Sequence, residues 1–103
     1  MPQVIYAPGA IRDLQRLREF LRPKNPVAAK RAASTILQAL QVLGLQPQMG
    51  RVVEGMPEPY REWIIDFGDS GYVARYRFDG DVVTILAVRH QKEVGYGVAP
   101  TTS

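Results

Sequence analysis

The only histidine of the sequence, His90, is the residue best suited by type to move a proton. It follows an apolar run and lies in the polar segment from Arg89 to Glu93, with Lys92 and Tyr96 close by. An imidazole beside cations and a phenol at the rim of a sheet could act as a general acid or base, because it titrates near neutrality. It could equally end a strand and bond a backbone group. Both roles stay open from the residues alone.

Three arginines form a second candidate site, one for phosphate. Arg75 and Arg77 are two residues apart and should project from the same side of a strand. With Arg61 they could form a basic surface for a phosphate group. They could instead pair with carboxylates on neighbouring strands, for which the candidates are Glu62, Asp66 and Asp79. We favour pairing, because residues 54–103 hold five basic and eight acidic side chains, a net charge of −3, and an RNA-binding surface should be more positive.

The sequence lacks the residues and motifs that disulfides, metal sites and nucleotide cofactors require. The chain has no cysteine, which excludes disulfides and thiolate sites, and one histidine cannot build a multi-histidine metal site. Phosphate loops, dinucleotide-binding turns and nucleophile elbows are also missing from the sequence. We therefore expect no metal and no cofactor. No run approaches the roughly 18 apolar residues of a membrane span, and the N-terminus lacks a signal-peptide layout, so we expect a cytoplasmic protein with no membrane partner.

Charge is distributed unevenly over the 103 residues, whose formal net charge is +3. Residues 1–53 hold eight basic and two acidic side chains, a net charge of +6. This imbalance could indicate an acidic partner, either nucleic acid or protein, or only a solvated helix face. The length and the 46% hydrophobic content fit a single domain, which we place at residues 1–96, with a disordered tail at 97–103.

The N-terminal half predicts a strand and a helical hairpin. Val4-Ile5-Tyr6 is a β-branched and aromatic run that indicates a strand, ended by Pro8-Gly9. Helical spacing of apolar residues begins at Ala10 and ends before Pro23. Asn25-Pro26 then predicts an N-cap and the first residue of a longer helix. Two amphipathic helices with so short a connection should fold back on each other, and the alanines of the second should let the axes approach closely.

The C-terminal half predicts three antiparallel strands. Residues 47–60 are rich in Pro, Gly and Met and indicate an irregular connection. Beyond residue 60 the sequence pattern repeats every two residues, as in strands, which predicts strands at 62–67, 72–78 and 82–88. The last run is almost wholly apolar, so it should be a central strand. The predicted fold class is therefore α+β: an N-terminal strand, an αα-hairpin and three antiparallel strands in one sheet, with the helices on one face.

This order of elements, with several short motifs, resembles the RelE/ParE superfamily of toxins from bacterial type II toxin–antitoxin modules. The resemblance extends from Val4 to about Tyr96. The motifs that carry it are Pro47-Gln48-Met49-Gly50-Arg51, Gly55-Met56-Pro57 with Tyr60-Arg61-Glu62, Ser70-Gly71-Tyr72 with Tyr76-Arg77, Asp79-Gly80-Asp81, and Arg89-His90. It implies a cognate acidic antitoxin, contact with operator DNA only through that antitoxin, and no cofactor.

The superfamily has two branches, and the resemblance implies a different target for each. RelE-like members cut mRNA on the ribosome with strand cations and a C-terminal tyrosine, whereas ParE-like members poison DNA gyrase. This chain keeps Arg61 but has Trp63 and Ile65 where the next two strand cations would fall, and Val73 where an arginine follows the Gly-Tyr pair. Losing cations that stabilise a phosphorane typically costs a few kcal/mol, so the RelE-type mechanism should be disabled.

We therefore expect a gyrase poison of plasmid-stabilisation type, with a ribosome-dependent mRNA endonuclease as the alternative. The endonuclease would use the residues Arg61, Arg75, Arg77, His90, Lys92 and Tyr96. The gyrase poison would use the basic hairpin, through Arg12, Arg16, Arg18 and Arg22. The antitoxin would bind at Trp63 and Arg31, although Trp63 could instead be a core residue. A third possibility is a non-toxic homologue that acts only as antitoxin partner and co-repressor.

Overall fold

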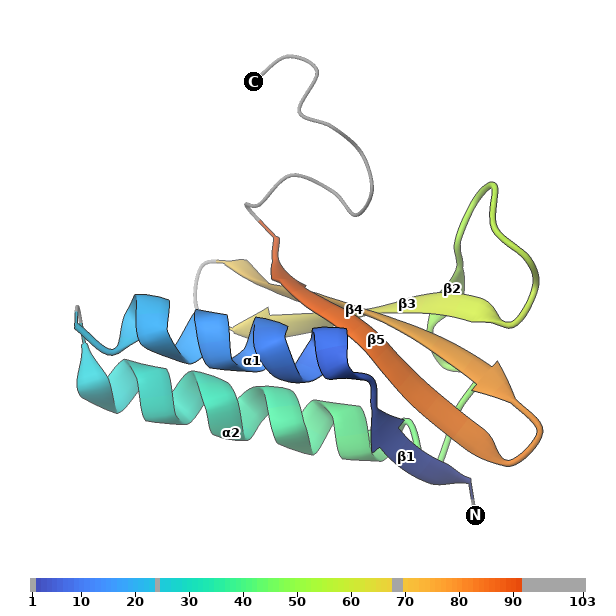
Figure 1. Ribbon diagram of the computed structural model, residues 1–103, viewed down its shortest axis with the longest axis horizontal. Helices are drawn as coiled ribbons and strands as arrows, with labels where there is room; N and C mark the ends of the chain where they lie inside the picture. The colour runs from blue at the N-terminus through green and yellow to red at the C-terminus, as the bar shows by residue number, and fades with distance from the viewer. Residues whose placement is uncertain (1, 24, 68–69, 92–103) are drawn as a thin grey trace.

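A computed structural model describes residues 2–23, 25–67 and 70–91 as two helices against one face of a single sheet (Figure 1). The elements in chain order are β1 (Gln3–Tyr6), α1 (Pro8–Leu21), α2 (Pro26–Val42), β2 (Arg51–Val52), β3 (Tyr60–Phe67), β4 (Ser70–Asp79) and β5 (Val82–His90). The predicted α+β class, with a helical hairpin on one face of the sheet, is confirmed.

Proline and asparagine set the helix boundaries. Pro8 and Gly9, predicted as a break, form the first turn of α1, where the missing N–H of proline costs nothing. The helix ends at Leu21, two residues before Pro23. At the start of α2 the Asn25 side chain accepts a hydrogen bond from the Ala28 N–H at 3.0 Å, so the predicted N-cap is confirmed.

The sheet has the strand order β1-β5-β4-β3-β2. β1 runs parallel to β5, and the other pairs are antiparallel. β5 lies inside the sheet, as its apolar sequence predicted. The prediction that residues 47–60 are wholly irregular is wrong at Arg51–Val52, which pair with Glu62 and Arg61 as a short edge strand. Two residues are too few for a period to be recognised in the sequence.

The core lies between the helices and one face of the sheet, which we call the helix-side face. Ile36 and Leu40 of α2 pack there with Tyr72 and Tyr76 of β4, which are 2% and 0% exposed. Both tyrosines are thus core residues, as their alternation predicted. No helix of the described ranges is long and apolar enough to cross a membrane.

A bulge in β5 ties the sheet to α1. Arg75 pairs with Ala87 and Tyr76 with Ile85, which leaves Leu86 without a partner in the ladder. The Val88 N–H donates a hydrogen bond to Asp13 Oδ2 at 2.9 Å. A carboxylate of α1 therefore satisfies a backbone donor next to the bulge.

Candidate functional site

Arg61 lies on the helix-side face of β3, directly opposite the buried Tyr76. Residues directly opposite in an antiparallel pair share a face of the sheet. Arg61 Nη1 donates hydrogen bonds to the Gly50 carbonyl at 2.8 Å and to the Gln48 carbonyl at 3.3 Å. The guanidinium therefore holds the backbone that follows α2.

The Tyr76 hydroxyl bonds to the same backbone segment, residues 47–50. It accepts a hydrogen bond from the Gly50 N–H at 2.9 Å and donates one to the Pro47 carbonyl at 2.7 Å. Burial raises the pKa of the Tyr76 phenol, and the Gly50 hydrogen bond and the charge of Arg61 lower it in part. A Cβ at Gly50 would lie 2.6 Å from the Tyr76 hydroxyl oxygen, so only glycine fits this approach. Arg61 and Tyr76 thus form one clamp on the segment 47–50.

Arg75 and Arg77 lie on the opposite face of the sheet, which we call the outer face. Arg75 Nη2 is 2.9 Å from Glu62 Oε2, and Arg77 Nη2 is 2.6 Å from Asp79 Oδ2. Arg51 joins the first pair at 3.4 Å from Glu62 Oε1. The prediction that Arg75 and Arg77 pair with carboxylates of the strands is confirmed for Glu62 and Asp79.

His90 lies on the helix-side face of the sheet, directly opposite Tyr72. The two rings meet edge to face, with centroids 5.3 Å apart. Burial raises the pKa of the Tyr72 phenol, which is 2% exposed. The imidazole of His90 is thus packed against a core tyrosine at the end of the last strand.

The described candidates for a nuclease site are divided between the two faces of the sheet. Arg61 and His90 lie on the helix-side face, and Arg75 and Arg77 lie on the outer face. The other two candidates, Lys92 and Tyr96, lie outside the described residues. The structure therefore does not bring the four described side chains together.

The two positions at which the resemblance would place strand cations are apolar and face the helices. Trp63 and Ile65 lie on the helix-side face, where Ile65 is 3% exposed and Trp63 packs against the core. The outer-face residues of this part of β3 are Glu62, Ile64 and Asp66. Two are acidic and one is apolar, so the outer face of β3 offers no cation at these positions.

Trp63 has a second environment besides the core. It lines a shallow hollow beside the edge strand β2, together with Met49 and Ile64. Met49 and Ile64 are 49% and 46% exposed. Both roles considered for Trp63, core residue and anchor for a partner, are compatible with this position.

The basic side chains of the hairpin face solvent. Arg12, Arg16, Arg18, Arg22 and Arg31 are all exposed. Arg16 forms an ion pair with Asp13, with 3.9 Å between Nη2 and Oδ1. Among the described residues, no carboxylate pairs with Arg12, Arg18 or Arg22. These cations are available to a partner, in contrast to Arg61, Arg75 and Arg77.

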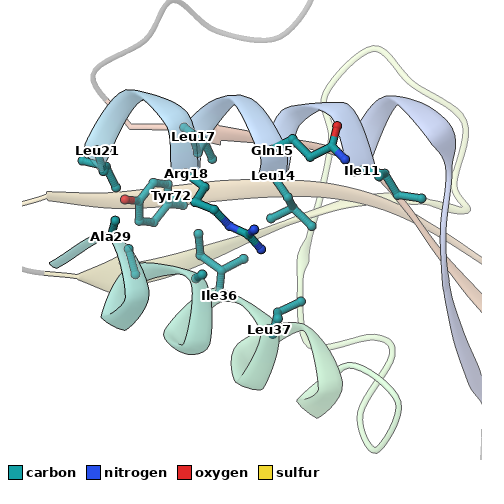
Figure 2. A pocket seen from close by; sticks show the side chains of 12 residues that line it. Ile11, Leu14, Gln15, Leu17, Arg18, Leu21, Ala29, Ile36, Leu37 and Tyr72 are labelled. Atoms are coloured by element: carbon teal, nitrogen blue, oxygen red, sulfur yellow. The ribbon is translucent and has the colours of Figure 1, made fainter. Parts of the chain in front are cut away.

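A groove runs between α1 and α2, which the sequence did not predict. It has a volume of about 260 Å³ and a largely apolar lining of Ile11, Leu14, Leu17, Leu21, Ala29, Ala32, Ala33, Ile36, Leu37 and Tyr72, with Gln15 and Arg18. Figure 2 shows α1 above, α2 below and Arg18 reaching into the space between them. The small side chains of Ala29, Ala32 and Ala33 form one wall of the groove. Their position opposite larger apolar residues of α1 was the available signal.

No group of three or more potential metal ligands occurs within residues 2–23, 25–67 and 70–91.

Comparison with known proteins finds toxins of type II toxin–antitoxin systems, with both ParE and RelE names among them. The family model described as "ParE toxin of type II toxin-antitoxin system, parDE" matches residues 4–95. "Toxin RelE3" of Caulobacter vibrioides is 38% identical over 93 residues, which are 90% of this chain and 98% of that protein. "Toxin RelE1" of the same organism is 37% identical over 90 residues, 87% and 94% of the two chains.

Solved structures share the fold at lower identity. "Chromosomal ParDE TA system from P. aeruginosa" has a TM-score of 0.73 at 18% identity and covers 87% of this chain and 96% of that one. The intact RelBE toxin–antitoxin complex of E. coli has a TM-score of 0.58 at 18% identity, with 90% and 100% covered.

Proposed function

This chain belongs to the RelE/ParE superfamily of type II toxin–antitoxin toxins, and we propose that it inhibits DNA gyrase and so blocks replication. The observation that carries the proposal is the division of Arg61 and His90 from Arg75 and Arg77 across the two faces of the sheet. A phosphoryl transition state needs its cations to converge on one point.

The protein partners of the strand arginines support the same proposal. Arg61 is bonded to backbone carbonyls, and Arg75 and Arg77 are bonded to carboxylates. A nucleic acid would have to displace these protein partners before it could use the cations. Arg12, Arg18 and Arg22 are exposed and pair with no carboxylate among the described residues, so they need no such exchange. We assign target binding to these three arginines together with Arg16, which is exposed and contacts Asp13.

A cognate acidic antitoxin neutralises the protein in this proposal, and operator DNA is contacted only through that antitoxin. The antitoxin contacts Trp63 in the hollow beside β2 and Arg31 on the exposed surface of α2. Two solved structures of the same fold, the ParDE system of P. aeruginosa and the RelBE complex of E. coli, are of toxin–antitoxin systems, which supports an antitoxin partner. The protein then acts in the cytoplasm, where its target is found.

The test is a pair of assays with the same purified protein. Titration into a gyrase supercoiling reaction should inhibit supercoiling, while addition to a translation reaction should leave the mRNA intact. Cleavage of translated mRNA with normal supercoiling would refute the gyrase proposal.

A ribosome-dependent mRNA endonuclease is the second candidate, and one finding favours it. The curated relatives that are 37% and 38% identical carry the name "Toxin RelE". In this alternative His90 and Arg61 take part in the chemistry, with Lys92 and Tyr96 beyond the described residues. The translation arm of the same experiment detects this activity directly.

A further inference from the structure

A second hollow, with a volume of about 570 Å³, lies at the loop end of the helical hairpin. Its cations are Arg18 in the last turn of α1, Arg22 at the C-cap of α1 and Lys30 in α2. The rest of its lining is apolar and consists of Pro26, Val27, Ala29 and Ala33. We call it the cationic hollow. It adjoins the groove between α1 and α2, with which it shares Arg18.

The three cations of the hollow have no carboxylate partner within the described part of the chain. The sequence explains why, because residues 20–53 contain no aspartate and no glutamate. Arg18, Arg22 and Lys30 are also all exposed. Their positive charge is therefore open to an anion from outside the chain.

The lining of the hollow strengthens the attraction for an anion. A cleft that is lined by charge of one sign and has walls of low dielectric constant focuses the electric field on its ligand. The proline, valine and alanine side chains supply such walls. Every polar side chain of the lining is a hydrogen-bond donor and none is an acceptor. The hollow therefore suits a ligand whose polar atoms are charged acceptors, such as a phosphate group.

We propose that the cationic hollow binds the phosphate backbone of duplex DNA. The inference rests on the proposed function for the source of that DNA, because gyrase acts on duplex DNA and a toxin bound to gyrase lies beside it. Arg18 and Arg22 are one helical turn apart, about 6 Å along the axis of α1. Lys30 lines the hollow from α2. The three side chains can thus contact neighbouring phosphates of one strand.

Shape and charge favour a duplex over an acidic protein segment. The loop ends of α1 and α2 extend beyond the sheet, at the far left of Figure 1, so a bulky rod can approach them without meeting the strands. A duplex carries one negative charge for about every 1.7 Å of its length, which suits a surface with cations and no acidic residue. Phosphate contacts carry no sequence information, so this contact is made to DNA of any sequence and recognises no operator.

Binding of the full chain to a short fluorescent DNA duplex, in the absence of gyrase, tests the hollow directly. Anisotropy titrations at several salt concentrations give the slope of log K against log salt, which is about −0.9 for each phosphate neutralised. Three cations therefore predict a slope of about −2.7 for the wild-type protein. Duplexes of unrelated sequence should bind equally well.

Substitutions at Lys30 locate the contact, with a control of equal charge change. Lys30→Ala should weaken duplex binding by about threefold or more and make the salt slope shallower by about 0.9, and Lys30→Arg should restore both. Arg51→Ala also removes one exposed cation, but Arg51 lies on β2 and does not line the hollow. It should change the affinity by less than about twofold. Thermal unfolding shows that each variant is folded.

A gyrase supercoiling assay with the same proteins separates this inference from the gyrase proposal. If the wild-type protein binds the duplex with the predicted slope but leaves supercoiling unchanged, the inference about the hollow stands and the gyrase proposal fails. Inhibition of supercoiling by a wild-type protein that does not bind the duplex at low salt overturns the inference alone. A protein that neither binds the duplex nor inhibits supercoiling contradicts both.

Three further results would overturn the inference about the hollow. Equal losses of duplex binding in Lys30→Ala and Arg51→Ala would show that binding follows net charge and not the hollow. Tighter binding to single-stranded RNA than to the duplex would make RNA the ligand. Weaker binding of Lys30→Ala to gyrase without DNA, together with unchanged duplex binding, would make an acidic surface of the protein target the occupant.

Discussion

The guanidinium of Arg61 donates a hydrogen bond to the Gly50 carbonyl at 2.8 Å. This strand cation, the one retained from the ribonuclease pattern, thus stabilises the backbone between α2 and β3. It faces the helix side of the sheet with Tyr76, away from Arg75 and Arg77.

Substitution Arg61→Ala should therefore lower stability. It leaves the Gly50 carbonyl without its charged donor, which should reduce the free energy of unfolding by about 1–3 kcal/mol. Arg77→Ala, which removes an exposed pair with Asp79, should cost about 0–1 kcal/mol. Urea unfolding measures both values. An Arg61→Ala variant with wild-type stability and no toxicity would indicate a catalytic role instead.

The Tyr76 hydroxyl should contribute to the same clamp. Tyr76→Phe removes two hydrogen bonds, to the Gly50 N–H and the Pro47 carbonyl, and should cost about 1–3 kcal/mol. Tyr60→Phe is the control, because Tyr60 is only half-buried and its hydroxyl has no hydrogen bond to the described residues. Equal unfolding midpoints for the two variants would show that the clamp is energetically unimportant.

Alkaline pH should destabilise the protein through its buried tyrosines. Burial raises the pKa of Tyr6, Tyr72 and Tyr76 above the ordinary value of 10.0. The unfolded chain therefore loses these protons first, and the stability that the neutral phenols contribute is full below 10.0 and lost as pH rises through the folded-state values. Urea unfolding across this range should show the decline, and Tyr76→Phe should show a shallower one. A slope unchanged in Tyr76→Phe would contradict this assignment.

The bond between Asp13 and the Val88 N–H should anchor α1 to the bulge of β5. Asp13→Ala leaves a partly buried donor unsatisfied and should cost about 1–3 kcal/mol. Asp13→Asn retains an acceptor oxygen and should recover most of that loss. Native-state hydrogen exchange at Val88 reports the bond directly, and equal protection in wild type and Asp13→Ala would refute its role.

The fold was largely predictable because its local signals are strong. Asn25 and the prolines set the helix ends, and alternation along residues 72–78 identified the buried tyrosines. The pair Arg51–Val52 escaped detection because a two-residue strand has no period and depends on its partner β3.

The site was less predictable, because the face on which a strand residue lies depends on register. Arg61 and Arg75 seemed able to share a surface, yet pairing of Arg61 with Tyr76 places them on opposite faces. The groove between α1 and α2 depends on how the side chains of two helices pack against each other, which the sequence of either helix alone does not determine. The basic character of the hairpin was accessible to sequence reasoning, and Arg12, Arg16, Arg18 and Arg22 are exposed in the structure.

We propose that the basic hairpin, and not the sheet, contacts the target. The most direct measurement compares Arg22→Glu with His90→Ala in the gyrase supercoiling assay, with both variants shown to be folded. We predict that Arg22→Glu raises the inhibitory concentration by about tenfold or more and that His90→Ala stays within about twofold of wild type. Full inhibition by Arg22→Glu together with an inactive His90→Ala would contradict the account.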